Sequence, residues 1–175
     1  VEDQGEAFSD IGLLLILIVV LVYIVMATQF ESLLYPFIIM FTIPFAMSGV
    51  FIALWLTGTP LSLIALIGAI MLVGIVTKNG IVMVDYMNLL VERGSTITDA
   101  VINGGKSRLR PVLMTSLTTI LGMLPMALGI GEGSETWQPM GIAVVGGLLM
   151  STLITLFIVP SLYAMLEGRM ERRAL

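Results

Sequence analysis

Two ionisable residues, Lys78 and Asp85, stand inside one apolar stretch of the sequence. A lysine near the middle of a membrane-spanning helix costs roughly 2.5–3.5 kcal/mol on insertion scales and is rarely kept without an anionic partner. Seven residues of helix put the two groups on one face but separate them by about 10.5 Å along the axis, which excludes direct pairing. We therefore expect the anion that pairs with Lys78 on a helix outside this chain, or on another copy of it.

Each of these residues also has a simpler interpretation. The long stem of Lys78 can lie along its helix and carry the ammonium group to the cytoplasmic headgroups. Asp85 falls where the apolar stretch is expected to reach the membrane surface, so it is either an interfacial residue or a member of a proton relay.

Hydroxyl side chains gather near the start of a later apolar stretch, at Thr115, Ser116, Thr118 and Thr119. We expect most of them to bond carbonyls of their own helix, and one or two to line a water path. The basic residues Lys106, Arg108 and Arg110 come just before them. Their simplest role is to anchor the helix at the cytoplasmic membrane surface.

The composition excludes several kinds of chemistry. Cysteine and histidine are absent, which removes disulfides, thiol nucleophiles, imidazole bases and the common zinc and haem ligands. The 13 methionines indicate adaptable apolar packing and not a metal site. A net charge of −4 argues against a nucleic-acid partner, and we expect no enzyme activity.

The elements that must position these residues are long apolar helices. Hydrophobic residues make up 58% of the 175 residues and charged residues 11%, which indicates lipid as the solvent. A span takes roughly 20 apolar residues. The sequence predicts five such helices, at about 11–30, 33–57, 61–92, 110–130 and 139–167. The fold class is therefore an all-α, polytopic membrane helix bundle over residues 11–167.

The connectors and small residues add detail. Thr96, with Asp99 three residues on, predicts the start of a short cytoplasmic surface helix at about 97–104, which Gly104-Gly105 should end. Thr57–Pro60 predicts a tight turn and Gly131–Glu135 a flexible loop. Kinks are expected at Pro44, Pro125 and Pro160. Close helix packing is expected at Gly68, Gly74, Gly80, Gly122, Gly141, Gly146 and Gly147.

Charge sets the expected orientation, because lysine and arginine collect in cytoplasmic loops. Seven of the eight basic residues fall in the third connector or the C-terminal end: Arg93, Lys106, Arg108, Arg110, Arg169, Arg172 and Arg173. The acidic Glu2, Asp3, Glu6, Asp10, Glu132 and Glu135 lie on the other side. We expect residues 1–10 outside, residues 168–175 as a cytoplasmic tail, and a piece of a longer chain without a cleavable signal.

Four stretches carry a family resemblance: Gln29–Ser32 followed by Pro36, Gly74–Gly80 with Lys78-Asn79, Arg108–Ser116, and Gly122–Pro125. Together they resemble the resistance-nodulation-cell division (RND) exporters of the hydrophobe/amphiphile type. The match runs in order over essentially the whole chain, and corresponds to the last five helices of the twelve-helix membrane domain.

The resemblance implies a site and its partners. In the family, the lysine matching Lys78 pairs with aspartates on a helix of the N-terminal half, and their protonation releases it. The residues matching Thr115 and Arg108 belong to the same proton path; Asn79, and Asp85 if it takes part, would stand beside it. The resemblance also implies a homotrimer in the bacterial inner membrane, driven by the proton gradient without a cofactor.

Further partners implied are a periplasmic adaptor and an outer-membrane channel, if the host is Gram-negative. Residues 1–10 would be the end of an extracytoplasmic porter domain. Substrates would bind in such domains. The sequence has no clustered methionine ladder that would indicate a metal path, which favours organic amphiphiles as substrates. Two alternatives stay open: a protein-secretion or lipid-export relative of the same superfold, and a structural helix bundle that transports nothing.

Overall fold

The computed structural model describes the backbone of residues 2–174 and the side chains of residues 5–169. Over that range the helices are α1 (Glu2–Phe30), α2 (Leu34–Met40), α3 (Thr42–Thr57), α4 (Leu63–Glu92), α5 (Ile97–Ala127) and α6 (Ser134–Ala174). Five segments are long and apolar enough to cross a membrane, because α2 and α3 together form one of them. The predicted all-α bundle with five spans is confirmed.

The second span breaks at Phe41, between α2 and α3. Pro44 lies in the first turn of α3 and has no N–H, so the Met40 carbonyl lacks the partner that a continuous helix would provide. The Phe41 N–H still donates to the Phe37 carbonyl at 3.1 Å. The effect of the proline is thus a break one turn before the residue itself.

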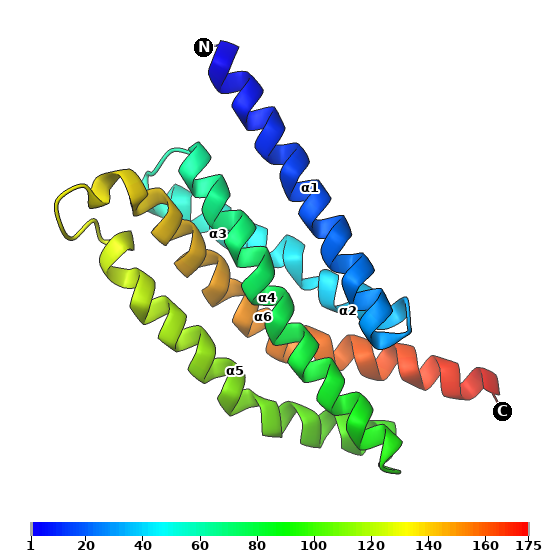
Figure 1. Ribbon diagram of the computed structural model, residues 1–175. Coiled ribbons are helices and arrows are strands. Elements are labelled where there is room, and N and C mark those ends of the chain that lie inside the picture. The colour runs from blue at the N-terminus through cyan, green and yellow to red at the C-terminus, as the bar shows by residue number, and fades with distance from the viewer. Residues whose placement is uncertain (1, 175) are drawn as a thin grey trace.

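Helix α5 differs from the sequence prediction, because it joins the expected surface helix at 97–104 and the expected span at 110–130 into one helix. Thr96 caps it as predicted, with the Asp99 N–H donating to the Thr96 hydroxyl at 3.2 Å. The two glycines do not end the helix. A Cβ on Gly104 would lie 2.6 Å from Met87 Cγ, so this glycine permits packing against α4. Pro111 lies inside α5, which is visibly bent in Figure 1.

The two chain ends are helical where the sequence predicted separate segments. Helix α1 includes most of residues 1–10, and α6 continues through most of the expected tail at 168–175. The side chains of Glu2, Asp3, Arg172 and Arg173, which contribute to the predicted orientation, lie outside the described ones.

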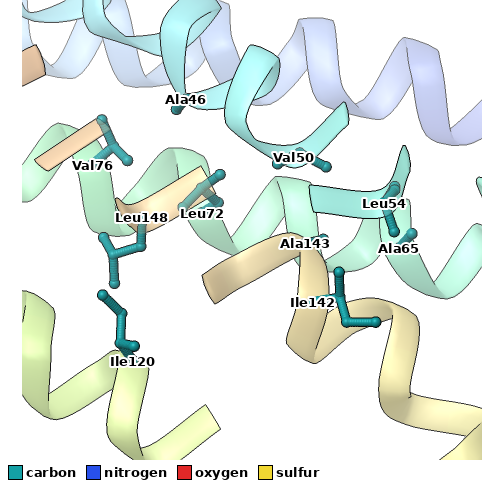
Figure 2. Close-up of a cluster of buried hydrophobic side chains, with 10 residues drawn as sticks. All are labelled: Ala46, Val50, Leu54, Ala65, Leu72, Val76, Ile120, Ile142, Ala143 and Leu148. Atoms are coloured by element: carbon teal, nitrogen blue, oxygen red, sulfur yellow. The ribbon is translucent and has the colours of Figure 1, made fainter. Parts of the chain in front are cut away.

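Helix α6 is the centre of the bundle and contacts α3, α4 and α5 (Figure 1). One buried apolar cluster joins these four helices, with Val50, Leu72, Ile120 and Leu148 among its members (Figure 2). A second cluster joins the ends of α1, α2, α4, α5 and α6, and includes Met26, Ile39, Met83, Val112 and Tyr163. The two clusters set the positions of α4 and α5, which carry the predicted site.

Glycine contacts bring the helices close together, as expected at five of the seven predicted positions. A Cβ would lie within 3 Å of a neighbouring helix at Gly68, Gly80, Gly141, Gly146 and Gly147. Gly49, which the sequence did not single out, is packed in the same way against α6. Gly74 and Gly122 have no heavy atom within 4 Å of an added Cβ. Within this chain these two glycines face open space.

Among the described residues, helix α1 packs against the bundle near its C-terminal end. Met26 is buried there among side chains of the second cluster, and the Tyr23 hydroxyl donates to the Leu33 carbonyl at 3.1 Å. Toward its N-terminal end α1 leans away from the other helices (Figure 1). Exposed apolar side chains such as Leu13, Ile16 and Leu17 cover this part of α1.

Candidate functional site

Lys78 lies midway along α4, and its side chain is exposed on the surface of the chain. It lines a hollow of about 150 Å³ between α4 and α5. The other lining residues are Asn79, Val82, Pro111, Val112 and Thr115, so the lining holds no second charged group. A lysine in the apolar middle of a span therefore stands beside a small, largely apolar hollow, without an anion in its wall.

Thr115 of α5 lines the same hollow as Lys78. Its hydroxyl donates to carbonyls one turn earlier in α5, at 3.1 Å from Pro111 O and 3.0 Å from Val112 O. Thr118 and Thr119 bond their own helix in the same way. The prediction that most of these hydroxyls bond their own helix is confirmed, and Thr115 combines that bond with a place next to Lys78.

Ser116 is the exception in this group. It is buried, and its Oγ accepts hydrogen bonds from Asn79 Nδ2 of α4 at 3.3 Å and from Thr152 Oγ1 of α6 at 2.9 Å. Asn79 and Thr152 are also buried. Three helices are thus joined by side-chain hydrogen bonds directly behind the hollow.

Asp85 lies apart from this group. It lines a different hollow, of about 310 Å³, where the end of α1 meets the end of α4. Glu31 and Glu92 line the same hollow, with Gln29 and Asn88 among its other polar residues. The surroundings of Asp85 are therefore acidic and polar, which fits the interfacial interpretation better than membership of the same group as Lys78.

Arg108 also lies apart from the hollow and contacts α4 near its C-terminal end. Its guanidinium carbon stands 4.4 Å from the centre of the Tyr86 ring, within the range of a cation–π interaction. Its Nε is buried without a hydrogen-bond partner among the described residues. Arg108 thus fastens α5 to α4 and is more than a headgroup anchor.

Among the described residues, none covers the side of α4 that carries Lys78. Its exposed residues recur at helical spacing and define what we term the open face: Ile67, Met71, Gly74, Lys78, Asp85, Leu89 and Glu92. Gly74, one of the two glycines without a neighbour, precedes Lys78 by about one turn on this face.

The structure therefore brings Lys78, Asn79 and Thr115 together, and leaves Asp85 and Arg108 outside the group. Thr152 and Tyr86 were missed in the sequence. Ser151, Thr152 and Thr155 are hydroxyl residues inside an otherwise apolar span, and that pattern was the available signal for Thr152. Which of them faces α5 depends on helix rotation, which the sequence pattern left undefined.

A family model described as the AcrB/AcrD/AcrF family matches residues 1–167. The chain belongs to this family. The resemblance to the RND exporters is thereby confirmed, and the AcrB/AcrD/AcrF family is one of transporters.

Two curated relatives match almost all of the segment. The multidrug resistance protein MdtC of Proteus mirabilis is 44% identical over 168 residues, which are 95% of this chain and 16% of MdtC. The swarming motility protein SwrC of Bacillus subtilis is 39% identical over 165 residues, again 16% of its length. The chain thus spans about one sixth of the curated relatives that it matches.

A solved structure confirms the fold of this part of the family. The crystal structure of a heavy metal efflux pump superposes with a TM-score of 0.86 at 33% sequence identity. The superposition covers 95% of this chain and 16% of that pump. The helix arrangement described above is therefore that of one membrane segment of an RND pump.

Proposed function

We propose that this chain is the C-terminal five-helix part of the membrane domain of a proton-driven RND efflux pump, and that Lys78 is the cation of its proton relay. The observation that carries the proposal is the position of Lys78. It lies in the middle of a span, on an open face, beside a hollow whose wall has no carboxylate. Such a lysine is rarely kept unpaired in a membrane.

The open face of α4 is the surface where the missing anion would approach. Gly74 has no neighbour there, and small residues let the backbones of two membrane helices come close together. The relatives are about six times longer than this chain, as their 16% coverage implies. A carboxylate-bearing helix from the N-terminal half would thus complete the pair with Lys78.

The pair would couple proton movement to helix movement. While the partner carboxylates are ionised, they hold the Lys78 ammonium by charge and hydrogen bonding. Proton binding neutralises them and removes the attraction, so that Lys78 moves toward Thr115 and the hollow between α4 and α5. The resulting helix displacement would reach the extracytoplasmic domains, where an amphiphilic substrate is expelled.

The relatives guide the proposed substrate and assembly. MdtC is named for multidrug resistance, so we propose organic amphiphiles as the cargo. From the family resemblance we propose a homotrimer in the bacterial inner membrane as the working unit. The proposed partners in a Gram-negative host are a periplasmic adaptor and an outer-membrane channel. The N-terminal end of the chain would face outward and its C-terminal end the cytoplasm.

Drug accumulation in cells tests the proposal directly. In the full-length parent, Lys78→Met should abolish export, as should collapse of the proton gradient. Lys106→Met is a matched control, because it removes the other lysine of the chain from an exposed position on α5. Export that survives Lys78→Met would contradict the relay role and favour an anchoring lysine.

Metal ions are a second candidate cargo, because the superposed structure is that of a heavy metal efflux pump. The same cells separate the two cargoes. Loss of the pump should raise sensitivity to lipophilic drugs and leave sensitivity to copper, silver and zinc ions unchanged; the reverse result would identify a metal exporter.

A further inference from the structure

On both α4 and α5, the residue that follows the proposed relay residue in the sequence belongs to a buried hydrogen-bond network. On α4, Lys78 lines the hollow and the next residue, Asn79, turns its amide inward to Ser116. On α5, Thr115 lines the hollow and the next residue, Ser116, turns inward. Neighbouring residues of a helix point about 100° apart, so the inward contact of one fixes the direction of the other.

Ser116 is the centre of this network. Its hydroxyl oxygen has two lone pairs, and it accepts two hydrogen bonds, one from α4 and one from α6. Asn79, Ser116 and Thr152 are only 8%, 2% and 6% exposed. Where water and headgroups are distant, these polar groups have little choice of partner, so they favour one arrangement of the three helices.

The bond from Thr152 is unusual among the buried hydroxyls. Thr77 and Ser151 donate to carbonyls of their own helices, at 2.6 Å and 3.2 Å, as such residues commonly do inside helices. Thr152 instead donates across to α5. Its hydroxyl therefore joins α6, the central helix of the bundle, to the two helices that carry Lys78 and Thr115.

We propose that Ser116 and Thr152 are positioning residues of the relay: through Asn79 they fix the rotation of α4 and α5, and so hold Lys78 and Thr115 at their shared hollow. This inference rests on the proposed function. A lysine nitrogen stands far from its helix axis, so a rotation of α4 by about 20° moves it by roughly 3 Å. That displacement exceeds the tolerance of a charged hydrogen bond.

The effect on proton uptake has a defined sign. The hollow contains no titratable side chain other than Lys78, so the groups that take up the proton are the partner carboxylates on the missing half. If Lys78 is held less firmly beside them, the carboxylates lose a stabilising positive charge and bind protons at higher pH. Weakening the network should therefore shift the pH dependence of transport upward.

The test uses the full-length parent in proteoliposomes, with transport driven by an imposed pH gradient and measured over a series of pH values. Ser116→Ala and Thr152→Val should each lower the maximal rate per folded molecule about tenfold. They should also raise the pH of half-maximal transport by about one unit. Ser116→Thr keeps the hydroxyl, so its maximal rate should lie within about twofold of the parent and its pH of half-maximal transport should match that of the parent.

Thr155→Val is the matched control, because Thr155 is a buried threonine one turn further along α6. It should leave the pH dependence unchanged. Equal shifts for Thr152→Val and Thr155→Val would overturn the proposal, as would a smaller amount of folded protein with an unchanged rate per molecule. If Ser116→Ala does not assemble, Thr152→Val decides the question alone. Loss of transport in Lys78→Met alongside a normal Ser116→Ala would reject this inference but keep the proposed function.

Discussion

Single glycines decide how closely α3 and α6 approach each other. A Cβ on Gly49 would lie 2.7 Å from the Gly146 carbonyl oxygen and 2.6 Å from Met150 Cβ. A backbone oxygen cannot move aside as a flexible side chain can. Overpacking at such a point forces the helices apart and typically costs about 1–3 kcal/mol.

We therefore expect Gly49→Ala to lower the free energy of unfolding of the full-length parent by about 1–3 kcal/mol. A lower midpoint temperature of thermal unfolding in detergent would show this loss of stability. Gly105→Ala is the control. A Cβ added to Gly105 would have no neighbouring atom within 4 Å. Gly105 also lies inside α5, where alanine favours the helix more than glycine does. Equal destabilisation by the two substitutions would contradict the close contact of α3 and α6.

The site could be predicted at this scale only in part. Lys78 stood out because a charge in an apolar span is costly, and the family motifs added Thr115 and Asn79. The sequence also named Arg108, yet the structure places its guanidinium against Tyr86 and not at the hollow. The bond from Thr152 to Ser116 joins residues 36 positions apart, and no periodic pattern specifies such a pair.

Helix α5 shows where local signals and packing diverge. Gly104-Gly105 predicted a helix end, because glycine is a poor helix former and a common terminator. In the structure α5 passes through both glycines, and Gly104 lies against Met87 of α4, where a larger residue would not fit. The capping signal at Thr96 was confirmed, because it depends only on residues within one turn.

The contact between Arg108 and Tyr86 fastens α5 to α4 at the level of these two helices. Tyr86→Leu should lower the stability of the full-length parent by about 1 kcal/mol, because the leucine has no aromatic face for the guanidinium. Tyr86→Phe keeps the ring and should stay close to the parent. Thermal unfolding of both variants in detergent provides the measurement. A phenylalanine variant as unstable as the leucine one would show that the tyrosine hydroxyl, and not the ring, matters.

For the whole molecule, the distribution of charge along the chain predicts an orientation in the membrane. Glu132 lies in the loop after α5 and Glu135 in the first turn of α6, whereas the first half of α5 carries the basic residues Lys106, Arg108 and Arg110. The positive-inside rule therefore predicts that Glu132 lies outside and Thr98 in the cytoplasm. The fold itself was predictable at this scale, because apolar length alone defines the five spans.

Single-cysteine labelling checks the orientation, and the chain has no cysteine of its own to interfere. In a cysteine-free full-length parent, an impermeant maleimide should label Glu132→Cys in cells with an opened outer membrane. Thr98→Cys should react only after the inner membrane is disrupted. Both positions are exposed in the chain. The reverse pattern of labelling would show that the segment is inserted the other way round.

Helix α1 is attached to the bundle near one end, so a small tilt at that end would move its other end much further. The helix is 29 residues long and is held by its last turns, next to Glu31, which has a positive φ of 48°. At 1.5 Å per residue, α1 reaches about 43 Å from that pivot, so a tilt of about 10° sweeps its far end through roughly 7 Å. A small displacement among the packed ends of α1, α2 and α4 would thereby produce a larger one at the N-terminal end of α1.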